Sequence, residues 1–111
     1  MPGYRIAIAG AGTGGLAAAA FLRRDGHEVR LFERFQSARP VGAGLMVQPT
    51  GLAVLARLGL DEAALGYGRV MRGISGHTIA GRTIFQTRYD VLGPRCFGIA
   101  MHRATLFDLL F

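Results

Sequence analysis

Lysine and tryptophan are absent from this chain of 111 residues, and cysteine is almost absent. Cys96 is the only cysteine, so an internal disulfide and a cysteine-based metal cluster are both excluded. A lone thiol is typical of a reducing compartment and predicts a cytoplasmic protein. The three histidines are far apart and lack the spacing of metal ligands, so we expect no metal site.

Positive charge comes from arginine alone. Thirteen arginines against seven acidic residues give a formal net charge of +6 and an isoelectric point of about 11.0. Only Arg23 and Arg24 are adjacent, and no aromatic residues alternate with arginines to form a stacking surface for bases. The codon bias of a GC-rich genome is a simpler explanation of this composition. We therefore expect no nucleic-acid partner.

The apolar run at residues 6–22 is too short for a membrane span. It has seventeen residues, whereas a spanning helix needs roughly twenty. Four glycines weaken its apolar character, and Arg23 and Arg24 follow it directly. We expect no membrane association. A secretory leader cleaved near Ala20 stays open as a weaker alternative.

The same residues divide more naturally into three short elements. Residues 4–9 are β-prone and apolar, as in a buried parallel strand, and they run into a glycine-rich loop. Residues 16–24 are rich in alanine and leucine and predict a helix that ends near Gly26. Residues 27–33 predict a second strand. This order, strand, glycine loop, helix and strand, indicates an α/β fold.

The glycine spacing within this unit is that of a dinucleotide-binding loop. Gly10, Gly12 and Gly15 follow the pattern G-x-G-x-x-G, which allows a tight turn, a close approach of backbone to a pyrophosphate, and close helix packing. The diphosphate then lies at the positive end of the helix. Glu33 ends the second strand, where a carboxylate can accept the ribose hydroxyls of an adenosine.

The segment GAGTGGLAAAAFLRRDGHEVRLFER, residues 10–34, resembles the N-terminal fingerprint of the FAD-dependent aromatic hydroxylases, which include salicylate and para-hydroxybenzoate hydroxylases. The positions of Ala19 and Gly26 after Gly15 match the FAD versions of the fingerprint. Residues 39–60 resemble the family's loop and helix beneath the flavin, and residues 101–110 resemble its His-Arg-x-x-Leu segment.

This resemblance implies the N-terminal part of a Rossmann-like FAD-binding domain and a set of cofactor contacts. The loop would surround the FAD pyrophosphate, Glu33 would hold the adenosine ribose with Arg34 beside it, and Arg103 would reach the ribityl-phosphate region. The loop residues concerned are Gly10, Ala11, Gly12, Gly14 and Gly15. The residues expected near the flavin are Gly44, Met46 and Gln48, although simple packing explains the last two equally well.

The resemblance also implies an activity, in which NAD(P)H reduces bound FAD and O₂ then gives a flavin C4a-hydroperoxide that hydroxylates a small aromatic substrate. No side chain of this chain is needed as acid, base or nucleophile, so we name no catalytic residue. Three alternatives stay open: another flavoprotein oxidoreductase, an NAD-dependent dehydrogenase half-domain, and a non-catalytic remnant.

The rest of the chain predicts further helices and strands. We expect a helix over residues 49–58 stopped at Gly59, a short helix over 61–65, and a hairpin of strands 70–80 and 83–87. In the resembling family this hairpin, at about residues 70–90, belongs to the sheet that covers the substrate. Residues 97–101 predict a strand of the nucleotide-binding sheet. Family members are several times longer, so we expect a fragment that is inactive alone.

Overall fold

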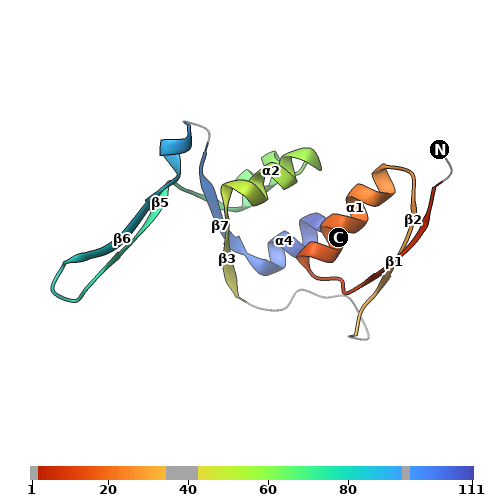
Figure 1. The fold of residues 1–111 in the computed structure, drawn as a ribbon, viewed down its shortest axis with the longest axis horizontal. Helices are drawn as coiled ribbons and strands as arrows, with labels where there is room; N and C mark the ends of the chain where they lie inside the picture. Colours follow the sequence, from red (N-terminus) through yellow and green to blue (C-terminus); the bar gives the residue numbers. More distant parts are fainter. Residues whose placement is uncertain (1–2, 35–42, 94–95) are drawn as a thin grey trace. The chain divides into compact units, whose positions relative to one another are not determined.

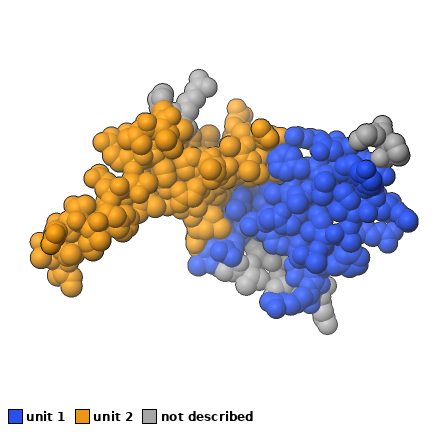
Figure 2. All heavy atoms as spheres, in the orientation of Figure 1, with its two compact units in different colours: residues 1–43, 102–111 blue, residues 44–101 orange. Residues whose placement is uncertain are grey.

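The computed structural model describes residues 3–34, 43–93 and 96–111. The chain divides into two compact units, residues 1–43 with 102–111 (unit 1) and residues 44–101 (unit 2), which Figure 2 shows in separate colours. Each unit is described by itself. Within the described ranges, no helix combines the length and the apolar character that crossing a membrane requires.

Unit 1 is built on the predicted strand–helix–strand unit. Strand β1 (Arg5–Ala9) pairs in parallel with β2 (Glu28–Phe32), and helix α1 (Thr13–Arg24) connects them (Figure 1). Helix α4 (Arg103–Leu110) packs against α1. The core of this unit joins the glycine loop to both helices, through Ala11, Leu16 and Phe107.

Two helices end as their sequences predict, each in the same backbone motif. After α1, the N–H of Gly26 donates to the carbonyl of Arg23, and the N–H of His27 donates to the carbonyl of Leu22. Gly26 has φ +91°, a conformation that costs glycine little. This pair of hydrogen bonds is the Schellman motif, which satisfies carbonyls at a helix end. Gly59, with φ +73°, ends α2 (Pro49–Arg57) in the same way.

Unit 2 contains a three-stranded sheet, a two-stranded hairpin and two helices. Strand β7 (Gly98–His102) lies between β3 (Gly44–Val47) and β4 (Arg69–Met71) in a three-stranded sheet. Helix α3 (Asp61–Tyr67) follows α2 and packs against it. The buried residues of this unit include Val47, Leu55, Ala64, Tyr89, Ile99 and Met101, of which Ala64 and Ile99 are completely buried.

A hairpin completes unit 2. Strands β5 (Gly73–His77) and β6 (Thr83–Arg88) pair antiparallel, and a register shift at Gly76 and His77 interrupts the pairing. Every residue of β6 is exposed to solvent. A 3₁₀ turn, η1 (Tyr89–Leu92), follows the hairpin and leads toward β7.

Two expectations about strands were wrong. The single strand expected over residues 70–80 is two strands that belong to different sheets: β4 pairs with β7, whereas β5 pairs with β6. The strand expected to join the nucleotide-binding sheet, β7, pairs with β3 and β4 instead of β1 or β2. In both cases the local pattern identified an extended segment correctly, but strand partners depend on contacts distant in sequence.

Candidate functional site

The loop between β1 and α1 and the first turn of α1 together contain the predicted glycines, which lie in two different environments. Gly10 turns with φ +106°, and its N–H donates to the carbonyl of Phe32 at 2.6 Å, which ties the loop to the end of β2. A Cβ on Gly15 would overlap the Gly10 carbonyl oxygen, whereas nothing lies within 4 Å of the Cβ positions of Gly12 and Gly14. The backbone is therefore packed tightly against the protein at Gly15, whereas the space beside Gly12 and Gly14 is open.

Helix α1 starts at this loop without local neutralisation of its positive end. Within the described part of the chain, no side chain caps the helix at Gly12, and its first turn contains no acidic residue. Its last turn carries Arg23 and Arg24, which complement the negative end. Exposed backbone N–H groups at a positive helix end favour a bound phosphate.

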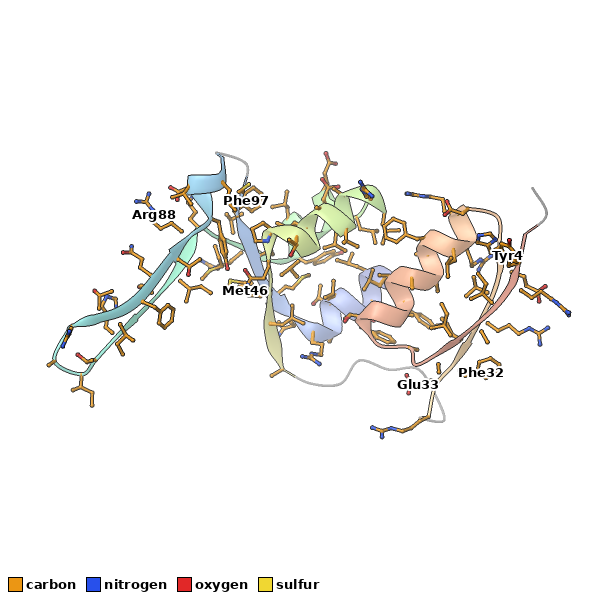
Figure 3. The ribbon with its side chains drawn as sticks, viewed as in Figure 1. Tyr4, Phe32, Glu33, Met46, Arg88 and Phe97 are labelled. Atoms are coloured by element: carbon orange, nitrogen blue, oxygen red, sulfur yellow. The ribbon has the colours of Figure 1, made fainter. Side chains whose placement is uncertain are left out.

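Glu33 lies directly beside the glycine loop. Its Oε2 accepts a hydrogen bond of 2.8 Å from the backbone N–H of Ala11, and its Oε1 accepts one of 2.8 Å from the N–H of Arg34. Ala11 is buried, with 6% of its surface exposed. Two backbone donors thus fix the carboxylate at the end of β2, and Figure 3 shows Glu33 beside that strand. A carboxylate at the end of the second strand is the kind of acceptor that ribose hydroxyls require.

Arg34 and Arg103 complete the predicted residues of unit 1. Arg34 follows Glu33 and is exposed. Arg103 is the first residue of α4 and is also exposed, and its backbone N–H donates to the carbonyl of Ala43 at 3.0 Å. This bond anchors the start of α4 within unit 1. The contact of each arginine with a cofactor stays a prediction.

The predicted flavin-side residues occupy unit 2. Gly44 and Met46 lie in β3, and Gln48 directly precedes α2, where its side chain makes no capping hydrogen bond. A Cβ on Gly44 would meet only the Met101 carbonyl oxygen, at an ordinary distance of 3.7 Å. The described structure therefore gives no steric reason for a glycine at position 44. The loop residues 39–42 that were expected near the flavin lie outside the described residues.

The sequence did not identify Tyr89, which joins two of these residues. Its side chain is 6% exposed, and its hydroxyl donates to Gln48 Oε1 at 2.5 Å and lies 3.9 Å from Met46 Sδ. Met46 is labelled in Figure 3. Because 41 residues separate Tyr89 from Gln48, no local pattern could have revealed the contact.

An ion pair borders Tyr89 in sequence. Arg88 binds Asp90 through two contacts, Nη2 to Oδ2 at 2.7 Å and Nε to Oδ1 at 3.2 Å. The hydrogen bond from Arg88 lowers the pKa of the Asp90 carboxyl from its ordinary value of 3.8. The same bond raises the pKa of Arg88. Both side chains are solvent-exposed to a substantial degree, so this pair is a local brace of η1 and not a buried charge.

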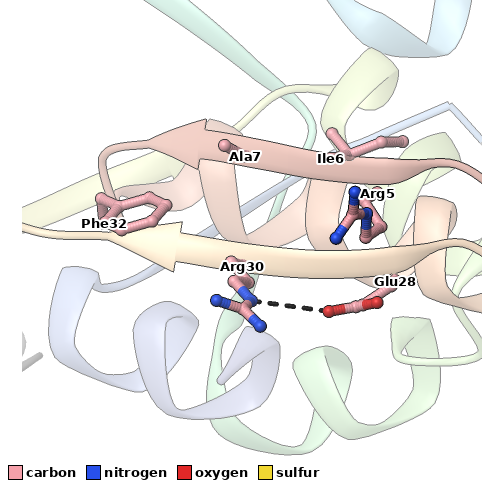
Figure 4. A pocket seen from close by; sticks show the side chains of 6 residues that line it. All are labelled: Arg5, Ile6, Ala7, Glu28, Arg30 and Phe32. Atoms are coloured by element: carbon pink, nitrogen blue, oxygen red, sulfur yellow. Dashed lines mark ion pairs between the residues drawn. The ribbon is translucent and has the colours of Figure 1, made fainter.

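Two open hollows lie away from the glycine loop and the Tyr89 contact. One, of about 340 Å³, lies against β1 and β2 and contains the Arg30–Glu28 ion pair of 3.5 Å (Figure 4). The other, of about 400 Å³, is mainly apolar and lies against α2, α3 and residues 96–97. Neither brings together groups that would perform a reaction.

The first unit, with its parallel strands, glycine loop and strand-end carboxylate, is that of a dinucleotide-binding protein. The family model of the FAD binding domain matches residues 4–105. The chain belongs to the FAD binding domain family. FAD is therefore the dinucleotide of this fold, and the resemblance to FAD-dependent aromatic hydroxylases is confirmed.

Individual relatives agree with this assignment. The 3-amino-4-hydroxybenzoate 2-monooxygenase of Streptomyces cremeus is 42% identical over 113 residues, which cover 96% of this chain and 28% of that protein. Phenazine 1,6-dicarboxylic acid hydroxylase PhzS of Lysobacter antibioticus is 39% identical over 107 residues, which cover 95% of this chain and 26% of that protein.

Solved structures confirm the fold. The chain is similar to 2-methyl-3-hydroxypyridine-5-carboxylic acid oxygenase, with a TM-score of 0.80 and 28% identity over 97% of this chain and 28% of that chain. The expected α/β fold of an N-terminal FAD-binding portion is therefore correct. The chain spans just over a quarter of the length of each of these three relatives.

Proposed function

We propose that residues 1–111 supply the adenosine and pyrophosphate part of the FAD site in a flavoprotein monooxygenase that hydroxylates a small aromatic compound. The observation that carries the proposal is the arrangement around the glycine loop. An open backbone face at Gly12 and Gly14, the uncapped start of α1 and the Glu33 carboxylate border the same short segment. The backbone at Gly12 and Gly14 and the start of α1 match the pyrophosphate of FAD, and the Glu33 carboxylate matches its ribose. The residues present therefore fit the cofactor.

In this proposal each residue has a separate role. The backbone around Gly12 and Gly14 binds phosphate oxygens, which a Cβ at these positions would obstruct. Glu33, already fixed by Ala11 and Arg34, accepts ribose hydroxyls. Arg103 donates to the cofactor's phosphate or ribityl oxygens, since a guanidinium carries five N–H donors.

The remaining parts of the proposal concern the whole protein. When bound, FAD supplies the redox chemistry, with NAD(P)H as reductant and O₂ as the source of the transferred oxygen. The relatives named above act on an aminohydroxybenzoate and on a phenazine dicarboxylic acid, which favours a small aromatic substrate. The exposed hairpin β5–β6 is proposed to contribute to a substrate-covering sheet. A cytoplasmic location is proposed from the single cysteine.

The test is a titration of FAD against the protein encoded by the native gene and against its Glu33→Gln variant. We expect the wild type to bind FAD, with quenching of flavin fluorescence, and to prefer it to NAD. Glu33→Gln keeps an acceptor for the Ala11 N–H but loses the charge, so we expect FAD affinity to fall about tenfold.

Glu28→Gln is the matched control. Glu28 lies on the same strand β2 but pairs with Arg30, at 3.5 Å, on an exposed surface. We expect this variant to bind FAD like the wild type. Equal losses in both variants would contradict a specific role of Glu33, and a wild type that binds NAD better than FAD would contradict the proposed function.

A further inference from the structure

The backbone of unit 1 engages both carboxylate oxygens of Glu33. Oε2 accepts a hydrogen bond from the N–H of Ala11, and Oε1 accepts one from the N–H of Arg34, each at 2.8 Å. Figure 3 labels Glu33 and Phe32 at the end of β2. The bond to Ala11 joins residues that are 22 positions apart in the sequence. The carboxylate therefore connects the end of β2 to the glycine loop, which a contact with a ribose alone does not require.

Two consecutive backbone donors attach the glycine loop to the end of β2. The N–H of Gly10 donates to the Phe32 carbonyl at 2.6 Å, and the N–H of Ala11 donates to the Glu33 side chain. Ala11 also belongs to the buried core of this unit, together with Leu16. Of the two bonds, only that of Ala11 depends on a side chain. A substitution can therefore remove it and leave the backbone bond in place.

The backbone donors that follow Ala11 are the ones that the proposed function assigns to phosphate. Gly12 precedes α1, Thr13 and Gly14 begin it, and all three residues are exposed. The first N–H groups of a helix have no acceptor within the helix. Because each peptide unit is planar, holding the N–H of Ala11 limits the directions in which the next N–H groups of the loop point.

We propose that Glu33 is a positioning residue in addition to a ribose acceptor: it holds the Ala11 N–H so that the loop presents its following N–H groups to the cofactor's pyrophosphate. This inference rests on the proposed function, because it assumes that the loop binds pyrophosphate. The negative charge of Glu33 acts in the opposite direction, since a carboxylate repels a nearby phosphate. Removing Glu33 therefore weakens pyrophosphate binding only if its hold on the loop outweighs that repulsion.

Inorganic pyrophosphate separates the two roles of Glu33, because it carries phosphate groups and no ribose. The experiment measures its inhibition constant as a competitor of FAD binding to the protein encoded by the native gene. Glu33→Ala removes both acceptor oxygens, whereas Glu33→Gln keeps a carbonyl oxygen that can accept the Ala11 N–H. Amide hydrogen exchange of residues 10–14 and the melting temperature are measured on the same proteins.

We expect Glu33→Ala to raise the pyrophosphate inhibition constant about fivefold, although the variant removes a negative charge beside the site. Glu33→Gln should bring this constant back to within about twofold of the wild type, because an acceptor is present again. The Ala11 N–H should exchange about tenfold faster in Glu33→Ala than in the wild type. A purely structural role would lower the melting temperature and leave the pyrophosphate constant unchanged.

Glu28→Ala is the matched control, because Glu28 lies on the same strand and pairs with Arg30 on an exposed surface. This variant also removes one negative charge, but it touches no residue of the loop. We expect its pyrophosphate constant and its exchange at Ala11 to equal those of the wild type. A loss of pyrophosphate affinity in Glu28→Ala as large as that in Glu33→Ala would overturn the inference.

The remaining outcomes separate this inference from the proposed function. If Glu33→Ala weakens FAD binding but leaves pyrophosphate binding unchanged or stronger, Glu33 acts through the ribose alone and only the inference is overturned. A wild type that binds neither FAD nor pyrophosphate overturns both. If Glu33→Ala does not fold, exchange in the wild type decides: an Ala11 N–H exchanging as fast as that of Gly14 overturns the inference, and one about tenfold slower supports it.

Discussion

The glycine loop of unit 1 and the Tyr89 contact of unit 2 are built in opposite ways. In the loop, backbone groups of consecutive residues form the candidate site, and Glu33 is drawn in by backbone donors. In unit 2, two side chains separated by 41 residues meet through a hydroxyl and an amide. The first arrangement is a property of local backbone geometry, whereas the second exists only when β3, η1 and β7 have packed together.

The comparison also separates two uses of glycine. Gly15 and Gly98 are required by neighbouring atoms of the protein itself, because a Cβ at either position meets backbone or side-chain atoms. Gly12 faces open space, so its value lies in what approaches from outside. Substitutions at these three positions should therefore divide into effects on stability and effects on binding.

The largest effect is expected at Gly15. In Gly15→Ala, the new Cβ would overlap the carbonyl oxygen of Gly10, and neither backbone segment moves easily. We expect a loss of about 3 kcal/mol or more in the free energy of unfolding, measured by urea titration. Gly14→Ala is the control, since its Cβ meets no atom within 4 Å, and it should be neutral or slightly stabilising. A mild Gly15→Ala variant would contradict the close loop packing.

Gly98→Ala should come next. Its Cβ would press on the Val47 carbonyl oxygen at 3.0 Å and on the Tyr89 ring at 3.3 Å, so the ring has to shift. We expect a loss of about 2 kcal/mol in unfolding free energy, measured by chemical denaturation. Gly66→Ala on α3, where nothing lies near the Cβ position, is the control. Equal stability of the two variants would show that the ring tolerates the crowding.

Gly12→Ala should leave stability unchanged and weaken cofactor binding. No protein atom lies within 4 Å of the new Cβ, but the methyl group would stand where a pyrophosphate approaches the backbone. We expect the FAD dissociation constant to rise about tenfold, which corresponds to about 1.4 kcal/mol. Isothermal titration measures the binding, and a melting curve provides the stability control. Unchanged FAD affinity would remove Gly12 from the site.

The smallest effect concerns the Arg88–Asp90 pair. The bond from Arg88 lowers the pKa of Asp90 below its ordinary value of 3.8. The contribution of the Arg88–Asp90 pair to the free energy of unfolding is therefore complete at pH values above 3.8. This contribution is lost as the pH falls through the lowered pKa of Asp90. Melting temperatures of the wild type and Arg88→Gln should differ slightly at neutral pH and converge in acid. A difference that grows as the pH falls would contradict this sign.

The local parts of the fold were predictable. The ends of α1 and α2 followed from glycines that close Schellman motifs, and the loop and Glu33 followed from fixed spacing along one strand–helix–strand unit. The strand partners of β4 and β7 were not predictable, because an extended segment of a few residues can pair with several neighbouring strands equally well. Only Arg72 separates β4 from β5, so no recognisable loop in the sequence marks the change of sheet.

By itself, the sequence determined the class of this protein: a glycine loop, a helix start and a carboxylate in fixed register, all encoded within about thirty residues of backbone geometry. Only the tertiary structure decided that Tyr89 is buried against Gly98 and holds Gln48 by its amide oxygen. The physical reason is the distance along the sequence between the residues that interact. Backbone turns are set by the residues that form them, whereas a hydrogen bond between distant side chains depends on how whole strands and helices pack.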